Sequence, residues 1–184
     1  MAIMNGTEHF SVNGEEMSLT MADFWKWAYS DLANSVHRSR LSEYIVASAL
    51  DADGIESSRS DFSGKPYDLL TANGLRITVK SAAYIQSQDA EHPDCVSFSI
   101  SASMTGEPDR QGSDIYIFCL YKGMRETESP LNLDLWEFYV LRSSVLDEKK
   151  PTQKTITLPS LMRLEPLWCD YHGIGEAIQT VMSA

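Results

Sequence analysis

Apolar and polar side chains alternate most clearly between residues 67 and 80, where the pattern predicts two short strands joined by a tight turn. The turn falls at Ala72-Asn73-Gly74, since Asn-Gly readily adopts the positive φ that a hairpin needs. In the second strand three aliphatic residues alternate with three polar ones, so each set shares one face. The aliphatic set is Leu75, Ile77 and Val79, and the polar set is Arg76, Thr78 and Lys80.

The register of this hairpin decides which face carries Asp68. A two-residue turn would place Asp68 opposite Val79, on the apolar face. A three-residue connection pairs Asp68 with Thr78 and Leu69 with Ile77 instead. Because a slip of one residue turns every side chain to the other face, the apolar pattern favours the second register. We therefore predict that Asp68 shares the polar face of the second strand.

The first predicted helix covers residues 18–33. Its apolar side chains recur at helical spacing as one wide stripe, and Thr20 with Asp23 forms a capping box at its start. We expect this helix to pack over the core. The alternative is that its paired tryptophans, Trp25 and Trp27, mark a surface for a partner.

A second helix is predicted from about residue 36 to residue 50, and it is apolar nearly all round, so we expect it to be largely buried. Glu43 lies within it, with apolar neighbours three, four and seven residues further on. A charged carboxylate in such surroundings is costly unless a partner meets it. The partner is either an arginine such as Arg40 or a metal ion, and we favour the metal because buried ionisable groups concentrate at functional sites.

The rest of the chain predicts further strands and a final helix. Residues 51–65 are rich in Asp, Ser, Gly and Arg, which is typical of a loop. No repeat or linker divides the sequence, so we expect a single α/β domain over residues 1–184, with a mixed central β-sheet flanked by helices. The further strands are expected at residues 96–103, 115–121, 136–141 and 154–158, and the helix at 175–182.

The composition indicates the class of protein and its expected location in the cell. The 184 residues and 43% hydrophobic content are typical of one globular domain. The longest apolar runs are too short to cross a bilayer, and the first 17 residues are polar and acidic, unlike an export signal. Three widely spaced cysteines, Cys95, Cys119 and Cys169, favour reduced thiols that serve in packing. We expect a cytoplasmic protein with no membrane association.

The net charge of −11 argues against a simple nucleic-acid binder, because phosphate contacts are made chiefly by Lys and Arg. It does not exclude a nuclease, since a metal site concentrates carboxylates and a local basic rim can outweigh a distant acidic surface. The basic residues nearest the hairpin are either such a rim or ordinary solvated charges. They are Arg38, Arg40, Arg59, Lys65, Arg76 and Lys80.

The hairpin resembles a known motif. Pro66-Tyr67-Asp68 followed by Thr78-Val79-Lys80 is similar to the PD-(D/E)XK motif of the restriction-endonuclease-like superfamily. The chain departs from that motif at Thr78, where the family usually has an acid. The resemblance implies a restriction-endonuclease-like core. Further segments look like one group of small bacterial proteins of this fold, namely residues 23–32, 41–46, 79–87 and 136–141.

The resemblance implies a divalent-metal-dependent nuclease that hydrolyses DNA phosphodiester bonds, in defence against foreign DNA or in repair. Mg²⁺ (or Mn²⁺) would be held by Asp68, by Glu43 and by the main-chain carbonyl of Val79. Lys80 would orient the attacking water and neutralise charge near the transition state. Thr78 completes the catalytic set, but it offers only a neutral hydroxyl, so the metal site is depleted by one charge.

The expected nucleic-acid partner is DNA. Arg40 and Arg76 are the candidate phosphate contacts, and the small side chain of Ser81 would let a substrate approach closely. Tyr84 and Gln86 would contact the DNA backbone or a bound water, or else are ordinary surface groups.

The loss of the second motif acid at Thr78 supports a different function. In this alternative the chain is a catalytically inactive member of the same fold, acting as a binding or assembly subunit for a protein partner. A homodimer is also expected by resemblance, because many relatives of this fold pair to cut both strands.

Overall fold

The structure is a computed structural model that describes residues 3–60, 65–84, 96–100, 112–125 and 127–184. Its centre is a mixed sheet of six strands in the described part of the chain. The strand order is β10 (Leu167–Cys169), β8 (Trp136–Arg142), β7 (Ile115–Tyr121), β5 (Arg76–Ala83), β4 (Leu69–Thr71) and β3 (Ser57–Arg59). Strands β5 and β7 run parallel, and the other neighbouring pairs are antiparallel.

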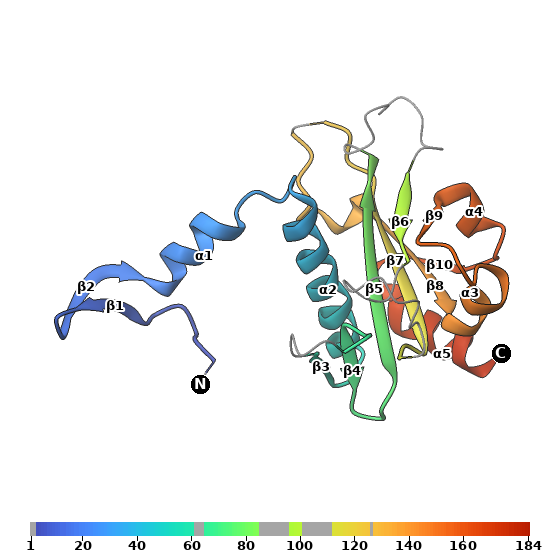
Figure 1. Ribbon diagram of the computed structural model, residues 1–184, viewed down its shortest axis with the longest axis horizontal. Coiled ribbons are helices and arrows are strands. Elements are labelled where there is room, and N and C mark those ends of the chain that lie inside the picture. The colour runs from blue at the N-terminus through green and yellow to red at the C-terminus, as the bar shows by residue number, and fades with distance from the viewer. Residues whose placement is uncertain (1–2, 61–64, 85–95, 101–111, 126) are drawn as a thin grey trace.

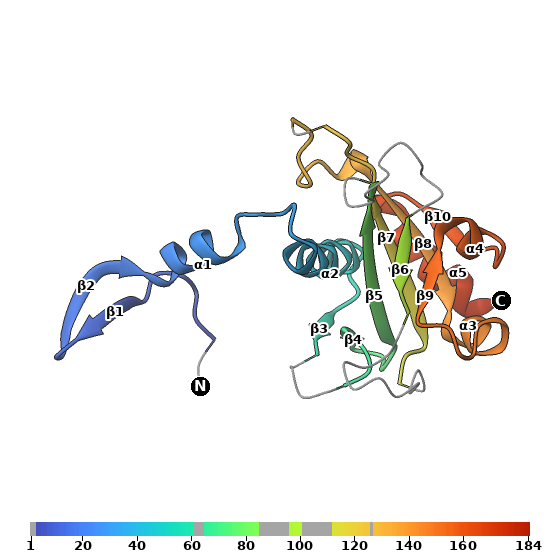
Figure 2. The same cartoon turned by 45° about the horizontal axis from the view of Figure 1, so that its top comes forward.

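Helices cover one face of this sheet (Figures 1 and 2). Helix α2 (Ser35–Ala52) packs over β5, and α5 (Ile174–Ser183) packs over β8 and β10. Helix α2 begins where the sequence predicts, because the side chain of Asn34 accepts a hydrogen bond from the Val36 amide. One side of α2 is buried, whereas Val36 and Tyr44 are 66% and 70% exposed, so the prediction of a largely buried helix holds for that side only.

A second layer covers the opposite face. It contains the small sheet of β6 (Ser97–Ser99) and β9 (Thr155–Thr157), with helices α3 (Ser143–Lys149) and α4 (Leu158–Met162). Two short 3-10 helices, η3 (Leu133–Leu135) and η4 (Tyr171–Gly173), connect neighbouring elements. We refer to everything from α2 onward as the body.

Two buried clusters fill the space between these layers. One lies beneath α2 and α5 and includes Ile77, Val79 and Ile117, and the other lies toward β6 and β9 and includes Phe118 and Leu120. Every residue of β7 is buried, which confirms the prediction of a strand covered on both faces.

The hairpin register is also as predicted. Leu69 pairs with Ile77, and the Asp68 amide donates to the Ile77 carbonyl at 2.9 Å, so the three-residue connection is the one that forms. Gly74 has a φ of +87°, the positive backbone angle that was predicted for the Asn-Gly turn.

Residues 3–29, which we call the arm, project away from the body (Figure 1). The arm consists of a hairpin, β1 (His9–Val12) with β2 (Glu15–Thr20), followed by helix α1 (Met21–Tyr29). The capping box of Thr20 and Asp23 is present as predicted. However, no residue of α1 is buried, so the expectation that this helix packs over the core was wrong.

Other elements differ from the sequence predictions. Residues 51–65 are not simply a loop, since they contain the end of α2 and strand β3. The arm hairpin lies in a segment whose polar and acidic composition does not predict strands, and α3, α4 and β10 were not predicted. Strand β6 is confirmed in part, because residues 101–103 of the expected strand lie outside the described residues.

Candidate functional site

Asp68 is the residue immediately before β4, at the end of the strand where its pairing with β5 begins. The Val79 amide donates a hydrogen bond to Asp68 Oδ2 at 2.8 Å. Because the N–H and C=O groups of one strand residue point to the same side, the Val79 carbonyl also points toward Asp68. The structure therefore brings the Asp68 carboxylate and the main chain of Val79 together.

The segment that carries Asp68 is held in place by two contacts at Pro66. The Thr78 hydroxyl donates to the Pro66 carbonyl at 3.1 Å, and Thr78 is only 2% exposed. Gly112 packs so closely on the Pro66 ring that a Cβ at this position would collide with it. Thr78 therefore holds the loop before β4 in place through a buried hydrogen bond. The predicted polar face of β5 is not accessible to solvent at Thr78.

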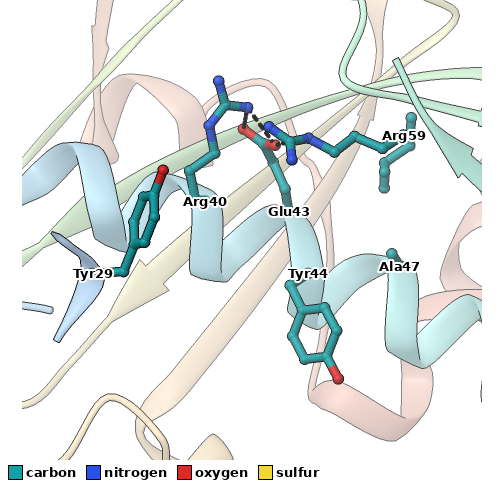
Figure 3. A pocket seen from close by; sticks show the side chains of 7 residues that line it. Tyr29, Arg40, Glu43, Tyr44, Ala47 and Arg59 are labelled. Carbon is teal, nitrogen blue, oxygen red and sulfur yellow. Dashed lines mark hydrogen bonds and ion pairs between the residues drawn. The ribbon is translucent and has the colours of Figure 1, made fainter. Parts of the chain in front are cut away.

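Glu43 approaches from α2 and is 7% exposed. Arg40 Nη1 donates to Glu43 Oε1 at 2.9 Å and to Oε2 at 2.7 Å, and Arg59 Nε lies 3.8 Å from Oε2 (Figure 3). The structure thus forms the ion pair with Arg40 that was one of the two interpretations of Glu43. Arg59, from β3, adds a second cation that sequence reasoning had placed in a loop.

Burial raises the pKa of Glu43, and the nearby negative charge of Asp68 raises it further, while Arg40 and Arg59 act in the opposite direction. The net direction is upward because the cost of desolvating the carboxylate outweighs the two arginines.

A cavity of about 340 Å³ opens beside Glu43. Its wall combines two guanidinium groups, one carboxylate, two aromatic rings and two small or aliphatic side chains (Figure 3). Neither tyrosine was predicted as a site residue, because Tyr29 comes from the arm and Tyr44 from the exposed side of α2. The lining residues are Tyr29, Arg40, Glu43, Tyr44, Ala47, Arg59 and Leu69.

Lys80 is placed differently from the two acids. Val79 lies in the cluster beneath α2, so alternation along β5 turns Lys80 toward the opposite layer, away from the helix that carries Glu43. Among the residues that the structure describes, Lys80 forms no salt bridge. Lys80 and Glu43 therefore lie on opposite sides of β5, and within the described residues no ion pair joins Lys80 to Asp68 or Glu43.

Arg76, a candidate phosphate contact, is already engaged. Its Nε and Nη2 donate to the two carboxylate oxygens of Asp114, at 3.0 and 2.6 Å. This bidentate pair lowers the pKa of Asp114. Arg76 is the first residue of β5, two positions before Thr78. Its guanidinium group is paired with a carboxylate rather than available to a phosphate.

The remaining predicted contacts lie near the far end of β5. Ser81 Oγ is buried and has no hydrogen-bond partner in the described part of the chain. Tyr84 is half-buried, and burial raises its pKa. Gln86 lies outside the described residues. Sequence reasoning missed a neighbouring polar group, in which Glu137 accepts from the Tyr139 hydroxyl at 2.6 Å and pairs with Lys122 at 3.0 Å.

The donor set for a cation is small. Within residues 3–60, 65–84, 96–100, 112–125 and 127–184, no three side chains of His, Cys, Asp or Glu form a cluster suited to a metal. The oxygens available near the two acids are those of Asp68, Glu43 and the Val79 carbonyl. This set fits an ion that retains several water ligands, as Mg²⁺ does.

No protein-family profile and no curated protein sequence matches the chain. The functional interpretation therefore rests on the residues described above. None of the helices in the described ranges combines the length and apolar character that a membrane span requires.

Proposed function

We propose that the mixed sheet and its helices form a restriction-endonuclease-like core. The proposal is supported by the order of elements along the chain. A helix, α2, precedes three antiparallel strands, β3, β4 and β5, and the motif residues Asp68 and Lys80 fall on the last two of these or beside them. Helices then pack on the faces of the sheet.

On this scaffold we propose a divalent-metal-dependent nuclease that hydrolyses DNA phosphodiester bonds. The observations that carry the proposal are the Asp68 carboxylate, which is held on the Val79 main chain, and the buried Glu43 carboxylate, whose pKa is raised by burial and by the charge of Asp68. Like charges that approach each other in a partly buried site raise the free energy of the folded state. A divalent cation between them would reverse that effect.

Asp68, Glu43 and the Val79 carbonyl would hold Mg²⁺ or Mn²⁺. When bound, such an ion makes water nucleophilic and stabilises the negative charge that develops on the phosphate. Thr78 keeps the segment before Asp68 in position through its hydrogen bond to Pro66. Lys80 would supply positive charge to the phosphate group from the side of β5 opposite to Glu43.

One observation favours the second candidate, a catalytically inactive subunit that binds a protein partner. Glu43 already has Arg40 and Arg59 as partners, so a cation would have to compete with two guanidinium groups. Thr78 adds no charge. Under this candidate the same cavity would serve as a recognition site.

The first experiment distinguishes these candidates by activity. Plasmid and linear DNA are incubated with the purified protein and Mg²⁺ or Mn²⁺, in parallel with Asp68→Asn, Glu43→Gln, Lys80→Ala and Thr78→Glu. The nuclease proposal expects cutting by the wild type and its loss in Asp68→Asn. Cutting that persists in Asp68→Asn would place the site elsewhere. A wild type that cuts nothing, beside a Thr78→Glu variant that cuts, would favour the inactive subunit.

The second experiment measures the ion without relying on activity. A ligand that binds only the folded state raises the melting temperature, so Mn²⁺ should raise the Tm of the wild type but not that of Asp68→Asn. Asp114→Asn is the matched control, because it removes an acid that Arg76 engages outside the proposed site. An equal shift in all three proteins would show that the ion binds elsewhere.

A further inference from the structure

The arm presents apolar side chains that the described part of its own chain leaves uncovered. None of the residues in β1, β2 or α1 is buried. Val12 pairs with Glu15 and Ser11 with Glu16, and the pairing register shifts between Ser11 and His9. The exposed apolar residues of the arm, in order, are Ile3, Met4, Phe10, Val12, Met17, Leu19, Phe24, Trp27 and Tyr29.

The local structure of the arm is nevertheless well specified. The turn Asn13-Gly14 has positive φ at both residues, as a tight hairpin requires. The Thr20 and Asp23 capping box starts α1, and Gly6 lies against the Trp25 ring. A two-stranded hairpin and a nine-residue helix are marginal in water without further packing. The arm therefore needs a surface that it can cover.

Trp27 is the most exposed of the arm's aromatic residues, at 84%. Tyr29, two residues later, lines the cavity beside Glu43. Residues two apart on a helix point in nearly opposite directions, so Trp27 faces away from this cavity in its own chain. A second chain, in contrast, can present its Trp27 to it.

The charges of the two surfaces are complementary. The arm carries four acids, Glu8, Glu15, Glu16 and Asp23, against one lysine, Lys26. The cavity places two arginines beside a single carboxylate. An indole ring is attracted to a guanidinium group that lies over its face, and the exposed ring of Tyr44 adds an apolar wall.

We propose that the arm of one chain packs on the α2 face of a second copy, with Trp27 entering the partner's cavity between Arg40, Tyr44 and Arg59. Because Trp27 faces away from the cavity of its own chain, a two-fold axis beside α1 would allow each Trp27 to enter the other chain's cavity. Such an interface is self-complementary and closed. An interface of standard size uses roughly 20–30 residues per partner, which residues 3–29 can supply. The inference does not depend on nuclease activity.

Sedimentation of the full-length protein over a range of concentrations tests the assembly. We expect a dimer whose dissociation constant rises at least tenfold in Trp27→Ala. The matched control is Trp168→Ala, which removes another exposed indole, 56% accessible on strand β10, and should leave the dissociation constant unchanged. A protein that is monomeric at every concentration, or a dimer that responds equally to both variants, would overturn the proposal.

Cross-linking tests the exchange itself. In a Cys95→Ser background, a chain with Trp27→Cys is mixed with a chain with Tyr44→Cys at a concentration above the dissociation constant of the Trp27→Ala variant, and the mixture is oxidised. The remaining native thiols, Cys119 and Cys169, are buried. We expect a disulfide between the two different chains, and none when Trp168→Cys replaces Trp27→Cys. A disulfide that forms instead within a single chain carrying both Trp27→Cys and Tyr44→Cys, with no link between chains, would show that the arm folds back on its own body.

Discussion

Strand β7 and helix α1 both have clear apolar patterns, but the structure treats them in opposite ways. All seven residues of β7 are buried in the sheet, whereas none of the nine residues of α1 is buried. A pattern of apolar positions predicts the type of an element because the period belongs to the element itself. It does not identify the molecule that covers the apolar face. The body and the arm differ in this respect, because the body covers its own apolar positions and the arm does not.

The largest effect is expected from a core substitution in the body. Phe118 is fully buried between the sheet and the layer of β6 and β9, so Phe118→Ala should lower the free energy of unfolding by about 3–5 kcal/mol. Phe24→Ala, in the arm, should change it by less than about 0.5 kcal/mol in the dissociated chain. Urea denaturation at low protein concentration measures both, and equal losses would mean that the arm packs on its own body.

A smaller loss is expected where the body holds the candidate site. In Gly112→Ala the new methyl group would collide with the Pro66 ring, which should cost about 1–3 kcal/mol and displace Asp68. Thermal unfolding measures the cost, and the Mn²⁺-dependent rise in Tm reports the displacement. If the variant keeps both the stability and the metal response of the wild type, the segment before Asp68 is not held by this contact.

The hairpin could be predicted from the sequence to the residue because its information is local. The turn residues and the alternation of Leu75, Ile77 and Val79 permit only one register that keeps Asp68 off the apolar face, and this register forms. The capping box of α1 was predictable for the same reason.

The partners of the site residues were harder to predict. Arg59 and Glu43 are 16 positions apart in sequence and meet only because β3 returns beside α2. The pairing of Arg76 with Asp114 spans 38 positions and depends on the parallel neighbour β7. Such contacts follow from topology, which alternation and capping do not determine.

The Arg76–Asp114 pair gives a pH-dependent contrast within the body. Because Arg76 lowers the pKa of Asp114, the pair stabilises the fold above the unfolded value of 3.8 and loses this contribution as the pH falls through the lower folded pKa. Asp114→Asn should cost about 1 kcal/mol at neutral pH. Its stability should converge with that of the wild type in acid, as urea denaturation from pH 7 to pH 2 would show. A constant difference across this range would mean that the carboxylate charge contributes nothing.

The smallest effect on global stability is expected from the arm's own cap. The Thr20 hydroxyl accepts from the Asp23 amide, and the Thr20 amide donates to the Asp23 carboxylate, so Thr20→Ala should weaken α1 by about 1 kcal/mol. Because α1 contributes nothing to the core of its own chain, the Tm of the body should not change, while amide hydrogen exchange in residues 21–29 should accelerate. If the arm covers a second copy, the same substitution should also raise the dimer dissociation constant, since an unfolded α1 must be ordered before Trp27 can dock. Faster exchange without weaker dimers would separate the local order of the arm from its role in assembly.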